Sequence, residues 1–403
     1  MKNTIAFFFF SPFIGLIQAL KHYRENWAKN SVWLFVVFYG YTMFRPEAMD
    51  ATRYVLKLQE LYGAPLNWDV FISNFYSEDG QSIDIYQPLV TYLLAFITDN
   101  GNILFAVFGI VFGYFYSRNI WLMLDLLGLK EANKTFWLLV IGFACVIGFW
   151  NLNGVRMWTA AHIFFFGTFN YIVHHKKSGI FIALTSIMVH FSFVLPVGIL
   201  FLFMFIKIPW RVLYFFFIAS FSISTLNISA FRSQLENIAP EFLIPRVKSY
   251  TSDEYVEVIS DINASANWYI TYYGKSINWL MVILFTIIYF SRLKNNYSKS
   301  FSDLFGFSLL FLSVGNITSL LPSGGRYLFI AQLFGMALLI YFYVRYENKL
   351  FDRWLMILSP LLLFFIIVSI RVSFDTVTFL TLFTNPLIAS FVDVPIPIID
   401  LFK

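Results

Sequence analysis

The chain has 403 residues, of which 59% are hydrophobic and only 13% are charged, and its mean hydropathy is +0.70. A soluble domain usually carries about 25% charged residues. The composition therefore excludes a soluble globular protein and predicts an all-α polytopic membrane protein, with residues 1–403 forming one integral membrane domain. The net charge of +5 is small and does not indicate nucleic-acid binding. The single cysteine, Cys145, excludes a disulfide framework and a cysteine metal site.

Apolar runs close to the length that crosses a bilayer as a helix recur along the chain. The first has one lysine before it and no small-residue cleavage site, so we expect a retained helix rather than a signal peptide. At about 20 residues per crossing, we predict about 12 transmembrane or half-spanning helices. They are expected near 4–20, 31–44, 102–117, 135–150, 155–173, 179–206, 210–230, 276–291, 303–321, 327–344, 354–370 and 375–392.

Clusters of basic residues separate these runs. Because Lys and Arg are enriched in cytoplasmic loops, we expect every cluster on the cytoplasmic side. The run 179–206 has a cluster at both ends, so it must turn back on itself near Ser192 to Pro196. The clusters are Lys21, Arg24 and Lys29; Arg118, Lys130 and Lys134; His174 to Lys177; Lys207 and Arg211; Arg292, Lys294 and Lys299; and Arg345, Lys349 and Arg353.

Two longer polar segments are left facing outward, 45–101 and 231–275. Within the first, the stretch 86–97 is too short to span comfortably, and we expect an interfacial helix there. The second contains Trp268 and Tyr272 beside Asp and Asn residues. Aromatic faces with polar neighbours suit sugar rings, although an interfacial aromatic belt explains them almost as well.

The stretch WNLNGVRMWTAAHIFFF (150–166) places ionisable side chains in apolar surroundings. Such a group is costly inside a bilayer and marks a functional hypothesis by default. Because the preceding run goes outward, we expect Asn153 and Arg156 near the outer boundary, where Arg156 either binds an anion or reaches the lipid headgroups. His162 lies about 9 Å deeper by the helical rise, and we expect it to hydrogen-bond a neighbour.

His190 and Arg326 are expected at the same boundary. His190, in SIMVHFSFVLP, closes an outward-going run, and an imidazole suits the removal of a hydroxyl proton near neutral pH. Arg326, in LLPSGGRYLFI, follows a break made by Pro322 and two glycines. Backbone N–H groups at a helix start, with an adjacent guanidinium, favour an anion. The alternatives are a packing histidine and an ordinary loop arginine.

Arg45, Asp50 and Arg53 follow the second apolar run in FRPEAMDATRY. They belong to a solvated loop, form a structural ion pair or are part of a site. Cationic positions and a histidine that converge on one leaflet predict a pocket for a lipid-linked anion. A diphosphate is the simplest such ligand, because arginine binds it bidentately.

The order of these motifs resembles a known family. Arg45, Asp50 and Tyr54 look like the family's first outer loop, and DIYQPLVTYLLAF (84–96) is similar to its interfacial segment. NGVRMWTAAHIFFFGTF (153–169) with KKSGIFIALTSIMVHFSFVLP (176–196) resembles its central signature, and SGGRYLF (323–329) its late arginine. Together these segments resemble the EpsG family of bacterial exopolysaccharide proteins, among the Wzy-like polymerases of O-antigen and capsule repeat units.

The resemblance implies a fold similar to the lipid-dependent, GT-C-like glycosyltransferases. It also implies a multi-pass protein of the bacterial inner membrane, with its active site and both large loops facing the periplasm. The substrate would be an undecaprenyl-diphosphate-linked oligosaccharide, used without a nucleotide sugar, cofactor or metal. Further expected partners are membrane lipids and a Wzz-like chain-length regulator, with no nucleic acid.

In that interpretation, a growing glycan moves from its lipid diphosphate to the terminal sugar of a new lipid-linked unit. Arg156 and Arg326 would hold the diphosphate and stabilise the charge on the leaving group. Either His190 or Asp50 would accept the proton of the attacking hydroxyl. The residues expected to bind substrate are Arg45, Arg53, Tyr54, Asn153, Trp268 and Tyr272.

Three other functions fit the same sequence features in part. An O-antigen ligase would share the topology and differ in its acceptor. A membrane O-acyltransferase would also use an intramembrane histidine, but it normally needs a further acidic or asparagine partner. A flippase or other transporter of lipid-linked oligosaccharide often has internal repeats with paired broken helices.

Overall fold

The computed structural model describes residues 7–47, 50–64, 67–69, 71–72, 84–223, 252, 254, 257, 261, 266–392 and 396–402. In these ranges every regular element is a helix, beside one isolated bridge between Thr378 and Pro397. The expected all-α class is therefore confirmed. In chain order the helices are α2 (Pro12–Lys21), α3 (Ala28–Thr42), α4 (Asp50–Tyr62), α6 (Tyr86–Ala95), α7 (Gly101–Asp125), α8 (Lys134–Val146), η1 (Phe149–Gly154), α9 (Val155–Ile172), α10 (Ser178–Val189), η2 (Phe191–Phe193), α11 (Val194–Phe205), α12 (Trp210–Ser222), α16 (Trp268–Tyr289), η4 (Arg292–Asn296), α17 (Lys299–Thr318), α18 (Gly325–Arg345), α19 (Lys349–Ser373), α20 (Phe379–Phe383), α21 (Pro386–Ala389) and η5 (Ile398–Phe402).

Several of these helices suit a bilayer. Within the described ranges, five helical segments are long and apolar enough to cross a membrane, and α10, α11 and α12 are shorter apolar helices beside them. These findings support a multi-pass membrane protein; the finer count of about 12 crossings stays a prediction. The five segments are Gly101–Asp125, Lys134–Ile172, Lys299–Thr318, Gly325–Arg345 and Lys349–Ser373.

The segment Lys134–Ile172 folds back at η1. The rings of Phe143 in α8 and Phe165 in α9 lie 5.2 Å apart between centroids. A continuous helix would hold these two residues more than about 30 Å apart. The end of α8 and the start of α9 therefore lie at the same end of the bundle, as the runs 135–150 and 155–173 predict.

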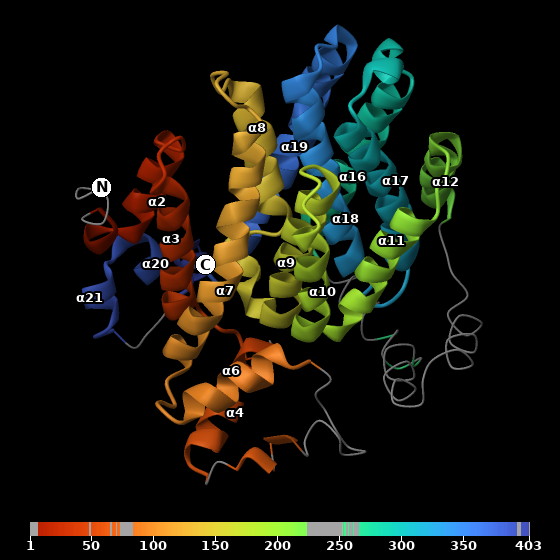
Figure 1. Cartoon of the computed structure of the whole chain (residues 1–403). Helices are drawn as coiled ribbons and strands as arrows, with labels where there is room; N and C mark the ends of the chain where they lie inside the picture. The colour runs from red at the N-terminus through yellow and green to blue at the C-terminus, as the bar shows by residue number, and fades with distance from the viewer. Residues whose placement is uncertain are drawn as a thin grey trace.

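The run 179–206 is also broken, and the break forms part of the site described below. Helix α10 ends at Val189, His190 is extended with φ −150° and ψ 115°, and α11 begins at Val194 after the short η2. Pro196 has no backbone N–H to continue α10, but it is tolerated in the first turn of α11. Figure 1 shows α10 running to the end of the bundle at which α9 begins, and α11 running away from that end. The predicted reversal near Ser192 to Pro196 is confirmed.

Two glycines bring α9 and α10 close together. A Cβ atom on Gly167 would collide with the backbone of Gly179, and a Cβ on Gly179 would collide with the backbone of Gly167. Small residues allow helix backbones to approach closely in membrane bundles. The helices lie side by side (Figure 1), and this packing places the start of α9 next to the end of α10.

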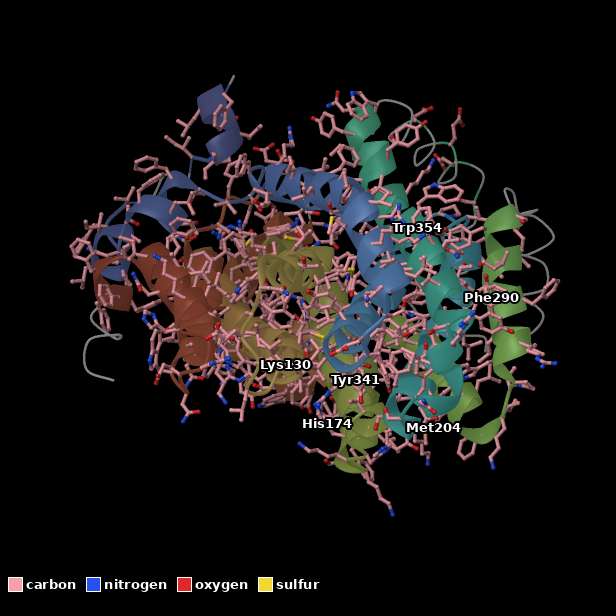
Figure 2. The ribbon with its side chains drawn as sticks, turned by 90° about the horizontal axis from the view of Figure 1, so that it is seen from above. Lys130, His174, Met204, Phe290, Tyr341 and Trp354 are labelled. Atoms are coloured by element: carbon pink, nitrogen blue, oxygen red, sulfur yellow. The ribbon has the colours of Figure 1, made fainter. Side chains whose placement is uncertain are left out.

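The basic clusters gather at one end of the bundle, which we call the basic end; it comprises the loops 22–27, 126–133, 173–177, 206–209, 291–298 and 346–348. Contacts join these loops. Arg24 Nη2 donates to the Lys130 carbonyl at 2.6 Å, and Lys130 Nζ donates to the Val344 carbonyl at 2.9 Å. His175 Nε2 lies 3.0 Å from Ser300 Oγ. Figure 2 views the molecule from this end, with Lys130 and His174 labelled. That this end faces the cytoplasm stays a prediction.

The segments α4 and α6 lie at the opposite end and run across the helix ends (Figure 1). On α6 and the turn after it, Leu93, Phe96 and Ile97 are exposed. This arrangement suits the interfacial helix expected at 86–97, which stays a prediction. Of the second predicted outer loop, 231–275, only residues 252, 254, 257, 261 and 266–275 are among those described.

The predicted run 375–392 is wrong as a spanning helix. It forms two short helices, α20 and α21, because polar side chains cap each of them. Thr378 Oγ1 accepts a hydrogen bond from the Thr381 N–H, and Asn385 Oδ1 accepts one from the Ile388 N–H. Pro386 then starts the second helix, a position at which proline is favoured.

The two ends of the bundle predict opposite labelling by an impermeant thiol reagent in intact cells. In a Cys145→Ala background, Glu47→Cys lies at the end opposite the basic end and should be labelled from outside. Lys176→Cys lies at the basic end and should react only after permeabilisation, because positive loops stay in the cytoplasm. Labelling of both positions from the same side would contradict this topology.

Candidate functional site

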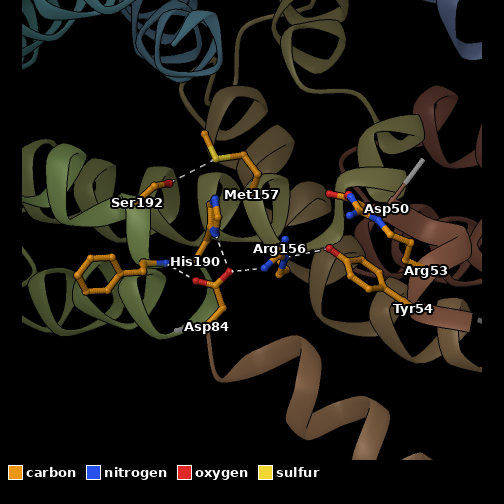
Figure 3. Close-up of polar contacts among 9 residues, drawn as sticks. Asp50, Arg53, Tyr54, Asp84, Arg156, Met157, His190 and Ser192 are labelled. Atoms are coloured by element: carbon orange, nitrogen blue, oxygen red, sulfur yellow. Dashed lines mark hydrogen bonds and ion pairs between the residues drawn. The ribbon is translucent and has the colours of Figure 1, made fainter. Parts of the chain in front are cut away.

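The carboxylate of Asp84 is the centre of a polar cluster at the end opposite the basic end (Figure 3). Its side chain is only 1% exposed. Oδ2 accepts a hydrogen bond from Arg156 Nη1 at 2.9 Å and lies 2.8 Å from His190 Nδ1. Oδ1 accepts the backbone N–H of Phe191 at 2.7 Å. Both oxygens of this buried carboxylate are therefore satisfied, as the cost of burying a charge requires.

Three separate segments bring these groups together. Asp84 precedes α6, Arg156 lies in the first turn of α9, and His190 lies in the break between α10 and α11. The Ile85 N–H donates to the Met188 carbonyl at 3.1 Å, which joins the Asp84 segment to the end of α10. The close packing of α9 and α10 places Arg156, at the start of α9, next to His190, just after the end of α10.

The surroundings of Asp84 favour its ionised form. Burial acts to raise the pKa of Asp84, but His190, the Phe191 N–H and Arg156 together outweigh burial and hold that pKa below its usual value. Asp84 is therefore a carboxylate at neutral pH. A carboxylate can only accept hydrogen bonds, so Nδ1 of His190 carries a proton and Nε2 is the ring atom that can accept one.

Arg156 is held by Asp84 and Tyr54. Its Nε donates to the Tyr54 hydroxyl at 2.9 Å, and its guanidinium carbon lies 5.7 Å from the centroid of the Tyr54 ring. Burial raises the pKa of Tyr54, and Arg156 offsets this effect only in part, so the hydroxyl is neutral. The side chains of Arg156 and His190 remain 27% and 16% exposed. Both can therefore be reached from the surface.

Asp50 and Arg53 pair with each other, which is one of the alternatives that the sequence left open for them. The two side chains form an ion pair on the first turn of α4, with exposures of 38% and 74%. No described contact joins them to Asp84 or His190, although Figure 3 shows them next to Tyr54. Asp50 therefore belongs to the edge of the cluster.

Arg45 lies apart from the Asp84 cluster. Its Nη2 donates to Asn102 Oδ1 at 2.6 Å, and its guanidinium lies 5.6 Å from the centroid of the Phe105 ring. Its Nη1 is buried and has no hydrogen-bond partner among the described residues. Burial lowers the pKa of Arg45, but arginine remains charged at any physiological pH.

The remaining predicted positions are less closely connected. Arg326 is exposed at the start of α18, and its side chain makes no hydrogen bond within the described part of the chain. Its neighbour Tyr327 donates to the Ser192 carbonyl at 3.4 Å, which places the start of α18 beside the His190 break. Asn153 is half-buried in η1, at the same end.

The two aromatic residues on α16 lie away from the cluster. Trp268 stacks on Phe364 of α19 at 5.9 Å, and Lys275 lies 5.0 Å from the centroid of the Tyr272 ring. Both aromatic side chains are more than half exposed. No contact among the described residues joins them to Asp84, Arg156 or His190.

His162 packs as expected, in the interior of the bundle. Its Nδ1 lies 3.2 Å from Asn119 Nδ2, and its carbonyl accepts from the same amide at 3.0 Å. The rings of Phe112 and Tyr116 meet it edge-on. His162 is therefore a core residue joining α7 to α9.

Asp84 is the residue that sequence reasoning missed. In the segment DIYQPLVTYLLAF (84–96), an apolar interfacial helix was predicted, but its first residue, Asp84, was given no role. The available signal was a single acidic residue directly before an apolar helix in an outward-facing segment. Such a residue is a candidate partner for a cation buried elsewhere at that boundary.

No family model, no curated protein and no solved structure matches this chain. The interpretation of the cluster therefore depends on its geometry and on the chemistry of its side chains.

The buried ion pair predicts a stability difference between two arginine variants. Arg156→Ala should lower the free energy of unfolding by about 2–3 kcal/mol, because Asp84 would lose its cation while His190 and Phe191 remain. Arg53→Ala, which breaks the exposed pair with Asp50, should cost less than about 1 kcal/mol. Thermal unfolding of both variants in the same detergent measures the difference, and equal losses would contradict the assignment.

The depressed pKa of Asp84 predicts a specific pH dependence. A carboxyl whose folded pKa lies below the unfolded value stabilises the fold above the unfolded pKa of about 3.9, and this contribution disappears as the pH falls through the folded value. In a His190→Asn background, which removes the ionisable imidazole beside the carboxylate, the difference in melting temperature between the chain with Asp84 and Asp84→Asn should be constant near neutral pH and shrink on acidification below about pH 4. A difference that grows on acidification would show that Asp84 is not held ionised.

Proposed function

We propose that this protein is a bacterial polysaccharide polymerase that acts on lipid-linked repeat units. The observation that carries the proposal is the bridging of Arg156 and His190 by Asp84, at the end of an apolar helical bundle opposite the basic clusters. A cation beside a histidine–carboxylate pair, close to a membrane surface, suits a lipid diphosphate donor and a hydroxyl acceptor.

The proposed reaction transfers the growing glycan between two lipid carriers. His190 Nε2 removes the proton of the acceptor hydroxyl, and the acceptor oxygen forms a bond to the anomeric carbon of the donor. The bond between that carbon and the diphosphate oxygen breaks, and undecaprenyl diphosphate leaves with the bonding electrons. Arg156, joined by Arg326 from the adjacent start of α18, stabilises the negative charge that develops on the diphosphate.

His190 is a better candidate base than Asp50. Its Nδ1 donates to Asp84, which orients the ring and stabilises the imidazolium formed when Nε2 takes a proton. Asp50 is already paired with Arg53 on α4 and has no described contact with the histidine. Asp84 acts through His190 and Arg156 and is therefore a positioning residue.

Other parts of the proposal depend on the family resemblance and on topology. They are a location in the bacterial inner membrane, a periplasmic active site, about 12 helical segments at the usual bilayer length, and a GT-C-like fold. Arg45, Arg53, Tyr54, Asn153, Trp268 and Tyr272 are proposed to contact the substrate. A Wzz-like protein is the proposed partner that regulates chain length.

The decisive experiment is a reconstitution. Purified protein in vesicles is given a defined undecaprenyl-diphosphate oligosaccharide, without nucleotide sugar, and the product is analysed for a ladder of repeat lengths. His190→Asn should slow ladder formation by at least ~100-fold, the usual contribution of a general base. Glu60→Gln, on the exposed face of α4, is the matched control and should retain the wild-type rate.

The outcomes separate the alternatives. A null strain that accumulates single repeats on the lipid carrier supports a polymerase, whereas unattached polymer indicates a ligase. Accumulation on the cytoplasmic leaflet indicates transport. If Asp50→Asn abolishes the ladder while His190→Asn preserves it, Asp50 rather than His190 is the base.

A further inference from the structure

A groove at the basic end lies far from the Asp84 cluster. Its volume is about 610 Å³, and it opens between the end of α2 and the start of α8. Most of its wall is apolar and aromatic, and Ile17 and Ile141 are partly exposed along it. The lining residues are Ile17, Leu20, Lys21, Tyr23, Arg24, Glu131, Ala132, Trp137 and Ile141.

The mouth of the groove carries two cations and one acid. Lys21 ends α2, and its side chain makes no hydrogen bond within the described part of the chain. Arg24 is anchored, because its Nη2 donates to the carbonyls of Lys130 and Leu129 at 2.6 and 3.4 Å. Glu131 is the acidic residue in the lining, so the mouth has a net positive charge.

Aromatic rings mark the level at which the apolar wall meets the polar mouth. Tyr23 and Trp137 pack edge-to-face with centroids 5.3 Å apart, and the Arg24 guanidinium lies 5.6 Å from the centroid of the Tyr23 ring. Tyr and Trp are enriched at membrane interfaces, where one side of the ring is apolar and the other wet. This order of apolar wall, aromatic rings and cations suits the boundary between acyl chains and headgroups.

A neighbouring cavity differs from this groove in the charge of its lining. It has a volume of about 420 Å³ and shares Tyr23 and Arg24 with the first. Its lining includes Glu25 and Asp125 as well as Arg24 and Lys29, so its charges balance. The charges of this cavity therefore give no reason to expect an anion, whereas those of the groove favour one.

We propose that the groove between α2 and α8 binds one acidic glycerophospholipid. The acyl chain lies along Ile17, Leu20 and Ile141, and the phosphate lies at Lys21 and Arg24. Basic pockets between helices on the cytoplasmic side suit anionic headgroups. The bound lipid joins α2 to α8 at the basic end and takes no part in the chemistry at Asp84.

The test uses the fluorescence of Trp137 in the full-length protein. The protein is reconstituted in phosphatidylcholine vesicles containing a minor fraction of phosphatidylglycerol, with bromine on the acyl chains of one lipid or the other. Because the chain has 11 tryptophans, the signal of Trp137 is the difference between wild type and Trp137→Phe. The quenching gives the relative affinity of the groove for the two lipids.

We expect brominated phosphatidylglycerol to quench Trp137 far more strongly than brominated phosphatidylcholine at equal mole fraction. Lys21→Gln, which leaves the Arg24 hydrogen bonds intact, should reduce the preference about fivefold, the effect of one basic residue near an anionic headgroup. Lys21→Gln with Arg24→Gln should abolish it. Lys349→Gln, at the same end but outside the groove, should leave it unchanged.

Equal quenching by the two lipids in the wild type would overturn the proposal. A preference that survives the double substitution, or that Lys349→Gln removes to the same extent as Lys21→Gln, would also overturn it. Such a result would show a general attraction of the basic end to anionic lipid rather than a site.

Discussion

A single carboxylate holds the candidate site together. Asp84 is almost fully buried, and its two oxygens bind groups from the start of α9 and from the break after α10. A buried carboxylate without partners would be too costly to keep ionised. The positions of Arg156, His190 and the Phe191 N–H are therefore linked to one another, since each contributes to the stability of the same anion.

The helical framework followed well from the sequence. The expected runs 155–173 and 327–344 agree with Val155–Ile172 and Gly325–Arg345 within a few residues, because apolar length and flanking charge determine where such helices start and end. The run 375–392 failed for a local reason. Thr378 and Asn385 cap short helices with their side chains, and a count of apolar residues is insensitive to capping.

The candidate site was only partly predictable. Arg156 and His190 were identifiable because ionisable residues stand out in apolar surroundings. Asp84 was not, since its partners lie far away in sequence and depend on how α9 and α10 pack. Asp50 was chosen instead because it lies in the segment that resembles the family's first outer loop and was expected near the outer boundary. A spacing of three residues on a helix, however, favours a local pair, and Asp50 forms one with Arg53.

The charges around Asp84 affect both the stability of the fold and the proposed proton transfer at His190. With His190 neutral, Arg156 and Asp84 cancel, and the cluster can be buried at modest cost. If His190 takes a proton, the new charge forms beside an ionised carboxylate that already accepts from the same ring. The group that offsets the charge of the partly buried arginine is thus also the group that would stabilise an imidazolium. A substitution at Asp84 therefore changes folding and reactivity together, whereas His190→Asn retains the Arg156–Asp84 pair. The histidine variant consequently isolates proton transfer more cleanly than any change at Asp84.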